Sequence, residues 1–164
     1  MGSGLMACIT VIGYGNPLRG DDGLGWFVAK QLAERVASDN IKVLALYQLT
    51  PELADEISRS ELVVFVDACC DQAPGHISCR AITPHTNPLS ATTHHLDPSS
   101  LLTFTQALYG TLPEITILLT VGGESFGYEE DLSPTVAAAV PVLEQVLETC
   151  INDGFDAALG GVLE

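Results

Sequence analysis

Short continuous apolar runs alternate along the chain with stretches in which apolar residues recur every three or four positions. Continuous runs are typical of strands covered on both faces of a sheet, and here they lie at residues 7–12, 41–47, 62–66 and 115–121. The stretches at helical spacing, residues 25–36 and 136–150, predict helices with one buried face. Residues 76–82 alternate between apolar and polar positions, which predicts a strand exposed on one face.

Three helix starts are marked by a capping residue followed by proline, because proline suits the first helical position. These pairs are Thr50-Pro51, Asp97-Pro98 and Ser133-Pro134. The helix that begins near residue 25 should end at the turn cluster 38–40, the second near residue 58 and the third before Gly110. Pro141 lies inside the last helix and should kink it or split it in two.

The order of these elements is β-α-β-α-β-β-α-β-α. The connection after Asp67 is too short for a helical crossover, so the strand at 76–82 should pair antiparallel at a sheet edge. We therefore predict a three-layer α/β/α sandwich whose mostly parallel, twisted sheet has about five strands, one of them an antiparallel edge strand. Residues 1–164 should form a single domain, with residues 1–5 a flexible start or cloning remnant and residues 153–164 a mobile tail.

Composition narrows the function classes. The chain has 21 acidic and 6 basic residues and a formal net charge of −15, which opposes binding to nucleic acid or anionic membranes and favours a cation, a metal ion or a basic partner. No apolar run approaches the roughly 18 residues of a membrane span, and the N-terminus lacks the basic region of a signal peptide. The 5 cysteines follow no disulfide pattern. We expect a cytoplasmic monomer with reduced thiols.

A glycine-rich loop, residues 13–25, joins the first strand to the first helix. Its glycines match neither the dinucleotide-binding pattern G-x-G-x-x-G nor the triphosphate-binding loop, which ends in Gly-Lys-Ser/Thr. Pro17 also lacks the backbone N–H that such a loop would donate to a phosphate. Asp21 and Asp22 lie near the helix N-terminus, where they would repel an anionic ligand. Two interpretations remain open: Asp21 caps the helix and Asp22 complements its dipole, or the carboxylates bind a metal ion.

Three candidate ligands converge if this layout is right. Asp22 follows the first strand, and Asp67 follows the run 62–66, at the edge of the sheet where α/β folds bind ligands. His94 or His95 lies in the loop before the third helix. Two carboxylates and an imidazole suit a borderline divalent metal and leave coordination positions open. An acid beside an apolar strand also needs a partner, which favours a functional Asp67.

Several segments, taken in order, resemble one family. They are Gly-Asn-Pro-Leu-Arg-Gly-Asp-Asp-Gly at 15–23, Gln-Leu-Thr-Pro-Glu-Leu at 48–53, Val-Phe-Val-Asp-Ala at 64–68, Thr-His-His-Leu-Asp-Pro at 93–98 and Gly-Glu-Ser-Phe-Gly at 123–127. From about residue 9 to residue 147 the chain resembles the nickel–iron hydrogenase maturation proteases. The segment 48–53 resembles the subgroup that serves cyanobacterial-type or bidirectional hydrogenases.

The resemblance implies an endopeptidase that removes the C-terminal extension of a hydrogenase large-subunit precursor after nickel insertion. By position, Asp22 and Asp67 would be metal-contacting acids, and either could serve as general base. His94 would be the third ligand, because the family places its histidine two residues before the aliphatic that is Leu96 here; His95 is the fallback. The nickel would arrive with the substrate. The alternative is a non-catalytic metal-binding or hydrogenase-subunit-binding chaperone that uses the same site.

Two other nucleophiles deserve comparison. Gly123-Glu124-Ser125-Phe126-Gly127 matches the serine nucleophile elbow, but all four histidines precede it and an acidic stretch, rather than a helix, follows it. We therefore interpret Ser125 as a structural loop residue. Cys69 or Cys70 could act as a thiol nucleophile with His94, although buried structural cysteine is the commoner role.

Overall fold

The computed structural model describes residues 8–85, 96–154 and 156–159. Its strands are β1 (Ile9–Tyr14), β2 (Ile41–Leu46), β3 (Leu62–Cys69), β4 (Ile77–Ala81) and β5 (Ile115–Gly122). They form one sheet in the order β2-β1-β3-β5-β4, in which only the β4–β5 pair is antiparallel. The predicted fold class is thereby confirmed, including the position of the antiparallel strand at an edge.

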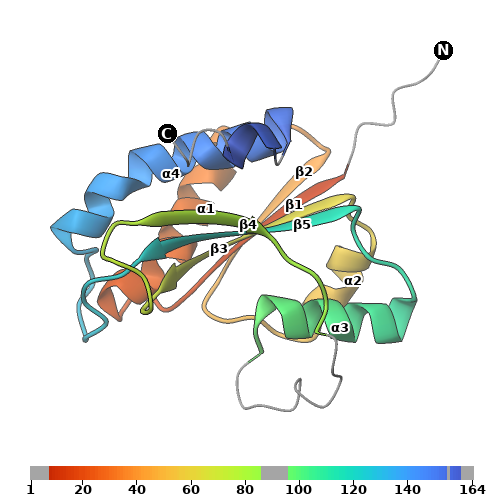
Figure 1. Ribbon diagram of the computed structural model, residues 1–164, viewed down its shortest axis with the longest axis horizontal. Coiled ribbons are helices and arrows are strands. Elements are labelled where there is room, and N and C mark those ends of the chain that lie inside the picture. The colour runs from red at the N-terminus through yellow and green to blue at the C-terminus, as the bar shows by residue number, and fades with distance from the viewer. Residues whose placement is uncertain (1–7, 86–95, 155, 160–164) are drawn as a thin grey trace.

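Helices cover both faces of this sheet (Figure 1). A short 3-10 helix, η1 (Gly20–Gly23), leads into α1 (Leu24–Arg35), and α1 shares one face with α4 (Pro134–Asp153). The opposite face carries α2 (Leu53–Ser58) and α3 (Pro98–Tyr109). Each face has its own buried apolar cluster, as expected when strand side chains alternate between the two faces.

The predicted caps of the two later helices are confirmed. Asp97 accepts a hydrogen bond from the backbone N–H of Ser100 at 2.7 Å, and Ser133 accepts one from Val136 at 3.4 Å. Gly110 ends α3 in the left-handed conformation, with φ at 70°. The second helix starts later than predicted, at Leu53, because a turn occupies the residues after Thr50.

Two boundaries differ from the sequence prediction. α4 runs unbroken through Pro141, so the helix is not split; Pro141 is exposed, while Leu143 and Leu147 are fully buried and hold the helix to the sheet. β3 continues past residue 66 because residues 67–69 pair with residues 120–122 of β5. This extension places Asp67 inside the strand, two residues after Phe65 and therefore on the α2/α3 face.

The C-terminal part of the chain packs on the α1/α4 side. Among the described residues α4 is the one helix long and apolar enough to cross a membrane by length and composition alone. Its buried residues belong to the core cluster on that face, which the core helix of a globular domain also explains. Residues 156–159 form a helical turn that brings Ala158, 1% exposed, into the same core.

Candidate functional site

The glycine loop positions Asp22 through the backbone. The N–H of Asn16 donates to Asp22 Oδ2 at 2.9 Å, and the side chain of Asn16 accepts a hydrogen bond from the N–H of Leu18. Gly15 has φ at 143°, and a Cβ there would lie 1.8 Å from the carbonyl oxygen of Asp22. Only glycine allows this fold of the loop. The Asp22 carboxylate is thus oriented before any ligand binds.

Asp21 has a different role from its neighbour. Its side chain is fully buried and accepts hydrogen bonds from the N–H groups of Glu124, Ser125 and Ser133 and from Ser133 Oγ, at 2.7–2.9 Å. Burial alone would raise the pKa of Asp21, but these hydrogen bonds outweigh it and lower that pKa below its usual value. The interpretation of Asp21 as helix cap is wrong, because α1 has no side-chain cap and Asp21 instead joins η1 to the loop after β5.

Asp67 lies beside Tyr14, at the end of β1. Burial is the main cause that raises the pKa of Asp67 to about 7; hydrogen bonds from Tyr14 and from the N–H of Ala68 lower it, and the charge of Asp22 raises it. Burial, together with the charge of Asp67, raises the pKa of the Tyr14 hydroxyl, which therefore remains a donor. A carboxyl group that titrates near neutral pH can exchange a proton with substrate.

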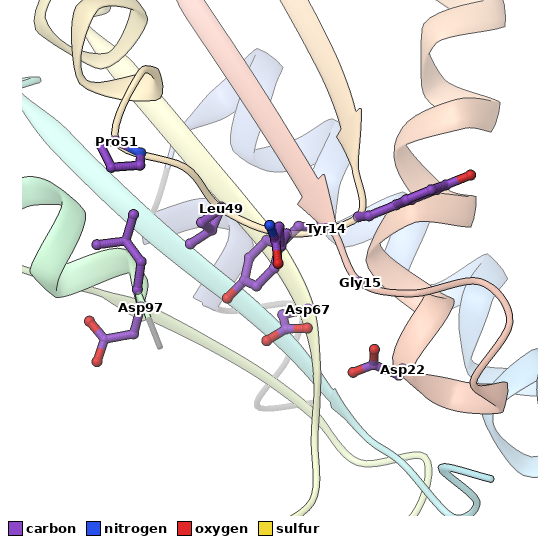
Figure 2. Close-up of a pocket in the computed structure, with 10 residues that line it drawn as sticks. Tyr14, Gly15, Asp22, Leu49, Pro51, Asp67 and Asp97 are labelled. Atoms are coloured by element: carbon purple, nitrogen blue, oxygen red, sulfur yellow. The ribbon is translucent and has the colours of Figure 1, made fainter. Parts of the chain in front are cut away.

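The two predicted acids face one cavity of about 580 Å³ at the carboxyl ends of β1 and β3. Figure 2 shows Asp67 between Asp22 and the hydroxyl of Tyr14, with Asp97 across the cavity. The remaining lining is supplied by Gly15, by residues 47–49 after β2, by Pro51 and by Leu96. None of the described residues that line this cavity is basic, so its electrostatic potential favours a cation.

The third predicted ligand, His94, and its fallback His95 lie outside the described residues. Leu96, two positions after His94 in the sequence, does line the cavity. Within the described ranges, no three histidine, cysteine or acidic side chains are grouped so that they could hold a metal ion. The structure thus brings two of the three candidates together, and the proposed metal set stays a prediction.

Two cavity residues were missed by the sequence analysis. The sequence gives no signal for Tyr14 beyond its place at the end of a strand. Asp97 was predicted only as a helix cap, but its Oδ1 also lies 3.2 Å from Nε2 of His85. The contacts of Tyr14 with Asp67 and of Asp97 with His85 could not be inferred from a local pattern, since each joins segments that are separate in the sequence.

Two of the rival nucleophiles, Ser125 and Cys70, lack the surroundings that such a role requires, whereas a thiol role of Cys69 stays a prediction because its proposed partner His94 lies outside the described residues. Ser125 lies in a loop that Asp21 holds at both the N–H and the carbonyl of Ser125, and the next helix begins only at Pro134. That arrangement confirms the structural interpretation of Ser125. The exposed Cys70 lies beside Asp71, whose charge raises the pKa of the thiol and disfavours the reactive thiolate.

Comparisons with known proteins agree with the fold and with the enzyme class. No family model matches the chain, and no curated relative was found. Among solved structures, the hydrogenase maturating endopeptidase HybD from E. coli is 28% identical, with a TM-score of 0.70 over 89% of this chain and 93% of its own. The [NiFe] hydrogenase maturation protease HycI from Thermococcus kodakarensis KOD1 is 23% identical, with a TM-score of 0.71 over 92% and 96%. These structures confirm the predicted enzyme class, a hydrolase that acts as a peptidase.

Proposed function

We propose that this chain is an endopeptidase that removes the C-terminal extension from the large-subunit precursor of a nickel–iron hydrogenase. One observation carries the proposal: two acids from separate elements, Asp22 of η1 and Asp67 of β3, converge on a cation-favouring cavity at the ligand-binding edge of the sheet. The likeness to the E. coli hydrogenase maturating endopeptidase supports the class of substrate. The motif at 48–53, part of which lines the same cavity, supports a cyanobacterial-type or bidirectional hydrogenase as its source, processed in the cytoplasm.

Nickel enters this proposal as part of the substrate. Carboxylate oxygens and one imidazole suit a borderline divalent ion, and three protein ligands leave room for the ligands that the precursor already provides. Asp22, Asp67 and His94 are the proposed contacts. A precursor without nickel would offer nothing to balance the negative charge of the cavity, so cleavage would follow insertion.

Asp67 is the stronger candidate for general base. Its pKa of about 7 allows it to accept a proton from the attacking water and to return it to the leaving amine. Tyr14 donates to the same carboxylate and thereby orients it, while Asp22 is held in place by the N–H of Asn16. These roles assign positioning of the metal-bearing part of the substrate to Asp22, and they assign two tasks to Asp67, a metal contact through one carboxylate oxygen and proton transfer through the other.

The test compares isosteric variants. Asp22→Asn and Asp67→Asn should remain folded, as judged by circular dichroism, and should lose processing of a nickel-loaded precursor by at least about a hundredfold. Asp39→Asn, which removes one exposed negative charge before β2, serves as the matched control and should process normally. Wild-type processing by a folded Asp22→Asn, Asp67→Asn double variant would overturn the proposal.

A further inference from the structure

A second cavity, of about 630 Å³, adjoins the first and shares Tyr14, Asp67 and Asp97 with it. We call it the Arg80 cavity. Its floor is formed by residues of β3, β5 and β4, which lie side by side in the sheet (Figure 1), and the first residues of α3 also line it. Asp67 therefore lies where the two cavities meet, so a polypeptide that occupied both cavities would pass this carboxylate.

The floor of the Arg80 cavity is polar, unlike the rest of the α2/α3 face of the sheet. Side chains alternate along each strand, so Ser78 and Arg80 of β4 and Thr120 of β5 lie on the same face as the buried Phe65. Thr120 is 9% exposed and donates to Gln72 Oε1 at 3.2 Å. Polar groups in such a position favour a ligand with hydrogen-bonding groups of its own.

Arg80 differs from the other 5 of the 6 basic residues. Arg35, Lys42 and Arg59 form ion pairs with glutamate or aspartate. Arg19 and Lys30 lie over the rings of Tyr128 and Trp26. Arg80 is an exposed residue of β4 that also lines this cavity, and it makes no hydrogen bond, ion pair or ring contact with any described residue of a protein whose net charge is −15. An unpaired guanidinium there is suited to an anionic ligand group, above all a carboxylate.

We infer that the Arg80 cavity binds the substrate's polypeptide on the C-terminal side of the cleaved bond, and that Arg80 pairs with a carboxylate of this departing segment. The inference rests on the proposed function. If the acidic cavity holds the metal-bearing part of the precursor, which precedes the cleaved bond, then the extension leaves Asp67 in the other direction. The carboxylate is either the chain terminus of the extension or an aspartate or glutamate side chain within it.

Binding of the extension can be measured without cleavage. The probe is a synthetic peptide with the sequence of the extension from the large-subunit precursor of the same genome, labelled with fluorescein at its N-terminus. Fluorescence anisotropy gives its Kd for wild type, Arg80→Gln, Arg80→Lys and the control Arg59→Gln. Arg59 is exposed, lies at the end of α2 and does not line the cavity, so Arg59→Gln makes the same charge change elsewhere.

Arg80→Gln should weaken peptide binding roughly tenfold, and Arg80→Lys should restore part of it because lysine keeps the charge without the planar fork. Arg59→Gln should bind as wild type does. Two further peptides separate the sources of the carboxylate: one ends in a carboxamide, and the other has its acidic side chains replaced by amides. The peptide that lacks the carboxylate paired with Arg80 should bind wild type about tenfold more weakly than the unmodified peptide does. Its affinity for Arg80→Gln should be no weaker than its affinity for wild type.

Equal affinity of wild type and Arg80→Gln for the extension peptide would overturn the inference, as would the absence of peptide binding to wild type. Processing of the precursor by wild type, measured in parallel, separates the two levels. If wild type and Arg80→Gln cleave the precursor with the same KM and bind the extension peptide with the same Kd, the inference is refuted and the proposed function is not. Arg80-dependent peptide binding without cleavage of any precursor in a panel refutes the proposed function and leaves the peptide site.

Discussion

Replacing Asp67 by asparagine should stabilise the metal-free protein, and more so at higher pH. The pKa of Asp67 is raised from the ordinary value of 3.8 to about 7, so the folded state binds its proton more tightly than the unfolded state. The contribution of Asp67 to the free energy of unfolding is therefore fully present below about pH 4, falls as pH rises, and is lowest above about pH 7. A difference of about three pH units corresponds to about 4 kcal/mol at most.

Asparagine keeps the shape of the side chain and an oxygen for the N–H of Ala68, but it carries no charge to desolvate. The stability advantage of Asp67→Asn over wild type should grow by about 2–3 kcal/mol between pH 5 and pH 8, since each pH unit below the folded pKa is worth about 1.4 kcal/mol. The same variant should be inactive. A more stable and inactive enzyme is the expected signature of a functional group that is held at a cost in folding.

The assay is urea unfolding followed by circular dichroism at pH 5, 6, 7 and 8 in the presence of EDTA, with Asp39→Asn as the variant that loses one exposed charge. A free-energy difference between wild type and Asp67→Asn that does not change with pH would show that folding does not raise the pKa of Asp67. A difference that grows in the opposite direction would show that the folded state favours the charged carboxylate.

Three further predictions follow from the same contacts. Tyr14→Phe removes a hydrogen bond that lowers the pKa of Asp67, so the acidic limb of the pH–rate profile should move to higher pH. An acidic limb at the same pH as in wild type would show that Tyr14 does not act on the catalytic carboxylate. Asp21→Asn replaces one acceptor oxygen by an NH2 donor, so at least one of the four buried hydrogen-bond donors loses its acceptor and faces another donor; the variant should cost about 2–4 kcal/mol in urea unfolding, whereas a loss below about 0.5 kcal/mol would contradict the role of Asp21 as a link between loops. A Cβ at Gly25 would lie 2.2 Å from the carbonyl oxygen of Val66, so Gly25→Ala should cost more than about 3 kcal/mol or abolish soluble expression. Gly127→Ala, which meets nothing within 4 Å, is its control and should change stability little.

The order of elements could be predicted from the sequence because each element carries its own period. Strands covered on both faces gave continuous apolar runs, and the short connection after β3 required an antiparallel β4. The residues at which an element ends could not be predicted where tertiary pairing decides them. β3 extends through a polar residue, Asp67, because β5 supplies hydrogen-bonding partners as far as Gly122.

The site was predicted only in part, for a physical reason. Asp21 and Asp22 are chemically identical neighbours, and what separates their roles is a set of donors 103 to 112 positions further along the chain. Tyr14 is near Asp67 because β1 and β3 pair in a register that matches Gly13 with Val66. Such contacts depend on register and packing, which a local pattern does not contain. What distinguishes Arg80 likewise depends on the ion pairs and ring contacts that the other basic side chains make in the fold, which the sequence does not contain.

The most direct test of the central claim is a mass measurement on two forms of one precursor. The protein is mixed with a nickel-loaded hydrogenase large-subunit precursor and, in parallel, with the same precursor free of nickel, and both masses are followed. A C-terminal fragment should be released from the loaded form alone. Equal release from both forms would contradict recognition of nickel, and a stable complex with no change of mass would identify a binding chaperone instead. Failure to cleave any member of a panel of loaded precursors would contradict the proposed peptidase function as a whole.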